Sequence, residues 1–208
     1  MEKEKVGKLE GIAHLQEGAN EFGRLILSMK EQLIDPDVAI FFMSGMVGYS
    51  CQAALIEKKQ NYYIVKTTNG KNYIYGDALN NYLFGAKESF YNILMGQFCH
   101  KLPQLEPLDI EAFLTRVSKN IGNEKYLIQE VINPDAFIDF ELYRSTWKKF
   151  YDTLIKYCKT PDEWPILFSI ALCLFLDIFD SNYGRLAYSF FVYVALENAI
   201  YVSKIPQI

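Results

Sequence analysis

The stretch that comes nearest to a catalytic motif is "GYSCQ" at residues 48–52, which places Ser50 and Cys51 side by side. It matches G-x-S-x-G, the strand-to-helix turn that exposes the serine of many hydrolases, at every position except the last. Such hydrolases order their triad as serine, acid and histidine, and Ser50, Asp77 and His100 follow that order. His100 is the only histidine downstream, so it would also have to activate Cys51 if the thiol were the nucleophile.

The same stretch can also be explained as part of a buried helix. Gln52 stands where the motif has its last glycine, and no glycine-rich oxyanion loop precedes it. Gly45, Gly48 and Cys51 fall about one helical turn apart, a spacing that lets a neighbouring helix approach closely. We therefore expect a helix over residues 38–58 that buries both candidate nucleophiles, with no active nucleophile. The buried Gln52 amide then needs a hydrogen-bond partner.

The sequence predicts neither a metal site nor a cofactor site. It has two histidines, His14 and His100, of which His14 lies in a charged segment and is expected to be solvated. The four cysteines show no C-x-x-C spacing, so they are interpreted as free thiols. Glycine loops of the kinds that hold nucleotides, G-x-G-x-x-G and G-x-x-x-x-G-K-[ST], are absent from the sequence.

Composition favours one soluble domain over residues 1–208. The chain is 50% hydrophobic and 15% aromatic, which is enough to form a core without disulfides or metals. The net charge is −4 and the charges are interspersed, so the absence of a basic stripe argues against a nucleic-acid partner. The first residues are charged and show no signal-peptide core, so we expect a cytoplasmic protein.

Apolar residues at helical spacing predict several helices. They lie over residues 22–33, 38–58, 88–100, 110–121, 147–158, 161–179 and 183–204. Thr160, Pro161 and Glu163 are residue types that favour the start of a helix at these positions. Residues 180–182 are expected to separate the last two helices. Five side chains of this last pair are expected in the core: Leu167, Ile170, Leu174, Phe190 and Val194.

The apolar runs at 164–176 and 186–196 raise the alternative of a membrane hairpin. The first run has only about 13 residues, whereas a bilayer span needs about 20. Charged residues, among them Asp177 and Arg185, also divide the pair into short pieces. We therefore expect two buried helices and no membrane partner.

One β-hairpin is expected at about residues 62–75. Two runs rich in β-branched and aromatic residues, Tyr62–Thr67 and Lys71–Tyr75, flank Asn69-Gly70, which favours a two-residue turn. A lone hairpin is marginally stable, so it should pack on helices or extend a sheet across a dimer. Asp77 is then expected to cap the next helix.

The resulting fold class is mainly α (α+β): a single-domain, helical bundle-like core with one hairpin. Residues 123–139 have weak periodicity and are expected to form an ordered surface excursion.

Three short motifs occur together from residue 38 onward: "GYSCQ" at 48–52, "GDALN" at 76–80 after the hairpin, and "EWPILF" at 163–168. With these motifs the chain resembles a family of small bacterial cytosolic proteins of about this length that are uncharacterised. Residues 123–139 fit the resemblance least. It implies no reaction and supplies no catalytic residue.

The sequence favours a non-enzymatic cytosolic protein that binds another protein, as an adaptor or immunity-type protein or as a homodimer. The surplus of tyrosine and phenylalanine supports this, because exposed aromatic residues favour interfaces. The alternative is a small serine or cysteine hydrolase that uses Ser50 or Cys51 with His100. A third hypothesis is a small-molecule pocket lined by tyrosines beside the hairpin.

Overall fold

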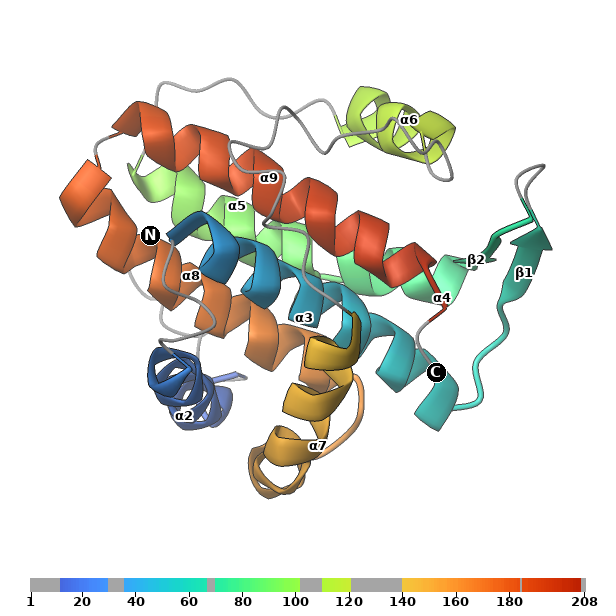
Figure 1. Cartoon of the computed structure of the whole chain (residues 1–208), viewed down its shortest axis with the longest axis horizontal. Helices are drawn as coiled ribbons and strands as arrows, with labels where there is room; N and C mark the ends of the chain where they lie inside the picture. The colour runs from blue at the N-terminus through green and yellow to red at the C-terminus, as the bar shows by residue number, and fades with distance from the viewer. Residues whose placement is uncertain are drawn as a thin grey trace.

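The computed structural model describes residues 12–29, 36–66, 70–101, 110–120, 140–183 and 185–206. Within these ranges the chain is mainly helical with one two-stranded antiparallel hairpin, which confirms the expected fold class (Figure 1). In chain order the elements are α2 (Leu15–Ser28), α3 (Pro36–Glu57), β1 (Tyr63–Lys66), β2 (Asn72–Tyr75), α4 (Asp77–Asn80), the π-helical turn η1 (Asn81–Gly85), α5 (Phe90–Lys101), α6 (Ile110–Asn120), α7 (Phe140–Tyr157), α8 (Glu163–Tyr183) and α9 (Arg185–Lys204). The predicted excursion at 123–139 lies outside the described residues.

The core is built around α3, which lies between α8 and α9 (Figure 1). Apolar residues occupy all faces of α3, so the helix has to be surrounded by other elements. Residues 39–55 are accordingly all buried. The predicted continuous helix through Ser50 and Cys51 is confirmed.

Two amphipathic helices, α2 and α7, cover one side of this core. Phe22 of α2 makes edge contacts with Phe150 of α7 and Phe168 of α8, with ring centroids 5.0 and 4.6 Å apart. Such edge contacts suit the charge distribution of aromatic rings. Leu15 and Ala19 are buried on the same face, so α2 begins one to two turns before the stripe that starts at Phe22.

The helix α8 runs to Tyr183, so the break expected at residues 180–182 is wrong. Aspartate, serine and asparagine lower helix propensity by less than about 1 kcal/mol each, which tertiary packing overrides. Of the five side chains expected in the core, those that are buried are Leu167, Ile170 and Val194. Leu174 is only partly buried, because it lies at a surface groove between α2 and α8. The Phe190 side chain lies outside the described residues.

The register of the hairpin differs from that of a two-residue turn. Lys66 pairs with Asn72, whereas a two-residue turn at Asn69-Gly70 would pair Lys66 with Tyr73. The turn residues 67–69 lie outside the described residues, but Gly70 has a φ of 80°, in the left-handed region that favours glycine. A loop with an odd number of residues and a left-handed glycine fits both observations.

The hairpin projects beyond the helices, with β2 on the side of α4 and α9 (Figure 1). Tyr73 and Ile74 of β2 are buried, whereas every residue of β1 is exposed. The expectation that the hairpin packs on helices is therefore met by β2, and β1 is left at the surface.

Among the described residues, α3 is the helix long and apolar enough to cross a membrane, judged by length and composition over Val38–Glu57. The sequence had raised that alternative for the C-terminal runs instead. In the structure 94% of this α3 window is buried. Its packing against α8 and α9 accounts for its apolar composition.

Candidate functional site

The two candidate nucleophiles lie in the interior of α3. Ser50 and Cys51 are both 0% exposed, and the helix is continuous through them, so no strand-to-helix turn presents either side chain. The Ser50 hydroxyl donates to the Val47 carbonyl of its own helix at 2.7 Å. Burial raises the pKa of the Cys51 thiol, which favours the unreactive protonated form.

The acid and the histidine of the predicted triad belong to other elements. Asp77 is exposed as the first residue of α4, and Gly76 holds the cap position, so the predicted Asp77 cap is wrong by one residue. His100 belongs to α5, and its side chain lies outside the described residues. The predicted contact between Ser50 and His100 therefore stays untested.

The glycines of α3 serve close packing, as predicted. A β-carbon at Gly48 would overlap the carbonyl oxygen of Ala199 in α9 and lie 2.8 Å from the Ser203 amide nitrogen. A β-carbon at Gly45 would overlap the Tyr143 ring and hydroxyl of α7. The two glycines thus face two different helices.

Buried amides complete the contact between α3 and α9. The Gln52 side-chain nitrogen donates to the carbonyls of Val202 and Ser203, both at 2.9 Å, and also approaches the Ile205 carbonyl. Carbonyls at the end of a helix lack amide donors from a following turn, and Gln52 donates to those of α9, although the Val202 carbonyl also accepts from the Ile205 backbone amide at 3.3 Å. Asn198 of α9 donates in return to the Phe41 carbonyl at 2.7 Å. The predicted partner for the Gln52 amide is confirmed.

The other described thiols are also protonated and unpaired. Burial raises the pKa of Cys158 and of Cys173 to about 12, and the nearby carboxylates of Glu163 and Asp177 add to the effect. His14, predicted as solvated, instead lies 3.1 Å from the Glu163 carboxylate. The described residues contain no group of three or more histidine, cysteine or acidic side chains that could hold a metal ion.

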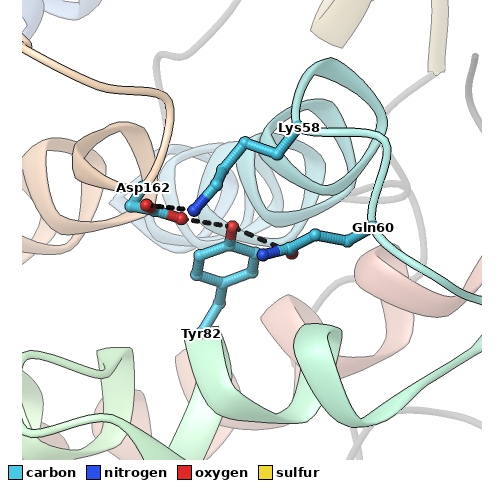
Figure 2. Close-up of polar contacts among 4 residues, drawn as sticks. All are labelled: Lys58, Gln60, Tyr82 and Asp162. Atoms are coloured by element: carbon cyan, nitrogen blue, oxygen red, sulfur yellow. Dashed lines mark hydrogen bonds and ion pairs between the residues drawn. The ribbon is translucent and has the colours of Figure 1, made fainter.

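Four polar side chains meet beside the first turn of α8, and we call them the Asp162 junction: Lys58, Gln60, Tyr82 and Asp162 (Figure 2). The Tyr82 hydroxyl donates to Asp162 Oδ1 at 2.6 Å and lies 3.2 Å from Gln60 Oε1. The Lys58 ammonium donates to Asp162 Oδ2. The junction joins the end of α3 and the turn η1 to the start of α8.

The end of α3 positions two members of this junction. The backbone N–H of Gln60 donates to the Leu55 carbonyl, and the backbone N–H of Lys59 donates to the Ile56 carbonyl. This is the hydrogen-bond pattern of a Schellman motif. Lys59 occupies the left-handed position of this motif, with φ of 53°, where glycine is usual. The resulting reversal places Lys58 and Gln60 on either side of Tyr82 (Figure 2).

The charges of the junction depend on one another. Partial burial raises the pKa of Asp162, but the hydrogen bonds from Lys58 and Tyr82 outweigh it, so the net pKa is lowered and the carboxylate is ionised. Burial and the Asp162 carboxylate both raise the pKa of Tyr82, which keeps its proton.

A cavity of about 290 Å³ opens beside the junction. It is lined by Gln60, Ala78, Asn81, Tyr82, Ala86, Glu88, Asp162, Pro165 and Ile166. Among the described lining residues Tyr82 is the one tyrosine, and none belongs to β1 or β2. The predicted tyrosine-lined pocket beside the hairpin therefore stays a prediction.

The outer strand β1 is a second candidate site, because it exposes large apolar side chains. Tyr63, Ile64 and Val65 are 72%, 59% and 46% exposed, and they are consecutive. Its opposite edge pairs with β2, so within the described two-stranded sheet the outer edge of β1 has no neighbouring strand.

Sequence reasoning did not identify the Asp162 junction. Lys58 and Asp162 are separated by 104 positions, so no local spacing could relate them. The exposure of β1 had a visible signal, since "YYIV" at 62–65 lacks the alternation of polar residues typical of a half-buried strand.

Comparison with protein-family models, with curated proteins and with solved structures gives no match. The resemblance to a bacterial cytosolic family therefore stays a prediction.

Proposed function

We propose that this chain is a non-enzymatic protein-binding protein whose binding surface is the outer edge of β1, and that it binds a second copy of itself there. The observation that carries the proposal is the exposure of three consecutive large apolar side chains, Tyr63, Ile64 and Val65. An exposed apolar edge strand offers free backbone groups and readily pairs with another strand.

A second copy suits this edge because β1 is complementary to itself. In an antiparallel pair, a two-fold axis perpendicular to the sheet makes one residue face its own copy. An axis at Ile64 places Tyr63 of each chain opposite Val65 of the other, an aromatic and β-branched pair of the kind that stabilises sheets. Each Lys66 then faces Tyr62 of the other chain, so the two ammonium groups stay apart.

The dimer would contain a four-stranded sheet in the order β2–β1–β1–β2. Three or more strands with an apolar face are stable where an isolated two-stranded hairpin is marginal. The contact has only about four residues from each chain, at the small end of specific interfaces, so we expect a dissociation constant on the order of 1–100 μM.

Light scattering after gel filtration, over a range of protein concentrations, tests the proposal. Wild-type protein should pass from monomer to dimer, and Ile64→Lys should remain monomeric, because an edge lysine opposes strand pairing. Ile155→Lys is the matched control, since Ile155 on α7 is 58% exposed against 59% for Ile64. A monomeric wild type at several hundred micromolar, or a dimer of Ile64→Lys, would contradict the proposal.

A cysteine tests the register independently. Opposed residues in an antiparallel pair have Cα atoms about 4.5–5.5 Å apart, within the reach of a disulfide. Mild oxidation should therefore crosslink Ile64→Cys into a dimer and leave Ile155→Cys largely monomeric. If Ile64→Cys forms a dimer but no crosslink, the protein still self-associates, and the proposed two-fold axis at Ile64 is wrong.

Other features support the class of function. A net charge of −4 without a basic stripe favours a protein over a nucleic-acid partner, and a cytoplasmic location remains part of the proposal. The hydrolase alternative has less support, because Ser50 and Cys51 are buried. An adaptor or immunity-type role fits a binding edge of this kind.

A further inference from the structure

The cavity beside the Asp162 junction has the composition of a cation site. Of the nine described residues that line it, five have side-chain oxygen atoms, two of them as the carboxylates of Asp162 and Glu88, and none of the nine is lysine, arginine or histidine. The remaining four side chains are apolar and lie mainly on α8 and α4: Ala78, Ala86, Pro165 and Ile166. A hydrated metal ion would gain little from such walls, whereas an organic cation has an aliphatic body to bury.

Lys58 shows what the Asp162 carboxylate binds. Its primary ammonium donates to Asp162 Oδ2 from the end of a flexible stem, and its side chain is 34% exposed (Figure 2). An ammonium group from a ligand could therefore take the same place while Lys58 turns into solvent. We propose that this cavity binds a small aliphatic primary amine, whose ammonium replaces that of Lys58 at Asp162.

The other polar groups fit an ammonium ligand. The Tyr82 hydroxyl has one proton, so it donates one hydrogen bond. It donates to Asp162, at 2.6 Å, rather than to Gln60 Oε1, at 3.2 Å. The Gln60 oxygen, which lies on the other side of the Tyr82 hydroxyl from Asp162, is thus left as a further acceptor in the cavity lining. An ammonium group has three donors, and one of them would replace the Lys58 hydrogen bond to Asp162. Glu88 lines the same cavity and is paired only loosely, 3.7 Å from the exposed Lys87.

The backbone at the cavity is also unusual. Asn81 and Tyr82 belong to η1, a π-helical turn, and turns of this kind are rare and occur frequently at functional sites. The proposed site is separate from the outer edge of β1, so it does not depend on self-association.

Calorimetric or NMR titration of the full chain with butylamine tests the proposal. Butylamine should bind saturably, with a dissociation constant on the order of 1 mM for so small a ligand. Butanol and butyrate, which have the same chain without the cation, should not bind. Saturable binding of magnesium or calcium chloride without binding of butylamine would overturn the proposal that the ligand is an organic cation.

Three variants locate the site. Asp162→Asn should weaken butylamine binding by more than about tenfold, because a hydrogen bond to a charged acceptor is lost. Lys58→Met should strengthen butylamine binding by up to about fivefold, because the Lys58 ammonium no longer competes with the ligand for Asp162. Lys149→Met, which removes an exposed lysine on α7 outside the lining, should leave affinity unchanged.

The Lys58 variant separates binding at this site from non-specific attraction to an acidic protein. Both lysine variants lower the net charge equally, so equal gains from Lys58→Met and Lys149→Met would overturn the proposal. Weaker binding in Lys58→Met would overturn it as well. Circular dichroism checks folding, and Glu88→Gln, expected to weaken binding a few-fold, replaces Asp162→Asn if that variant fails to fold.

Discussion

Gly48 of α3 lies directly against the Ala199 carbonyl of α9, and a side chain at position 48 would occupy the space of that carbonyl. The obstacle is backbone rather than a movable side chain. The distance between the two central helices is therefore set by the missing side chain at Gly48.

We expect Gly48→Ala to lower the free energy of unfolding by about 1–3 kcal/mol, because α9 has to move to admit the methyl group. Urea denaturation followed by circular dichroism measures the change. Gly23→Ala is the matched control, since a β-carbon at Gly23 in α2 meets nothing within 4 Å. The control should gain about 0.5–1 kcal/mol from helix propensity, and equal losses in both variants would contradict the packing explanation.

Cys51 should resist iodoacetamide in the native protein and react once the protein is denatured, because its thiol is buried and protonated. Cys158, which is partly exposed, provides an internal reference that should label before Cys51. Ser50→Ala should change stability by no more than about 1 kcal/mol, since its hydroxyl bonds only within its own helix. Fast labelling of Cys51, or of Ser50 by a fluorophosphonate, that disappears in His100→Ala would instead establish the hydrolase.

Lys59→Gly should raise the free energy of unfolding by up to about 1 kcal/mol, because glycine adopts the left-handed conformation at this position without strain. Thermal and urea denaturation measure the gain. Lys148→Gly, within α7, should have the opposite sign and lose about 1 kcal/mol. A loss in Lys59→Gly would show that the lysine side chain contributes more than the strain removes.

Glu197 predicts a pH dependence of stability. It is 0% exposed, burial raises its pKa from 4.5 to about 7, and Arg116, with Nη2 3.4 Å from its Oε2, opposes that rise. Because the folded pKa exceeds the unfolded one, the contribution to stability is fully present below about pH 4.5 and is lost as pH rises through 7. Between pH 5 and 8 the wild type should lose about 1–3 kcal/mol relative to Glu197→Gln. Parallel pH profiles of the two proteins would contradict the assignment.

Local patterns in the sequence determined most of the elements. Apolar residues on all faces predicted that α3 would be a buried helix, and the spacing of Gly45 and Gly48 predicted close helix packing. Periodicity and burial follow from the side chains of one segment, so these features can be predicted without knowing the rest of the fold. The hairpin was predictable for the same reason, except that its register depends on the loop conformation.

Only the tertiary structure decided which surfaces are free and which polar groups meet. Lys58, Tyr82 and Asp162 come from the end of α3, from η1 and from the residue before α8, and no periodicity relates positions so far apart. Similarly, β1 and β2 have similar compositions, but only β2 is covered, because it lies beside α9. Contact and exposure depend on how whole elements pack, and that is set by the sum of many weak long-range interactions rather than by any one segment.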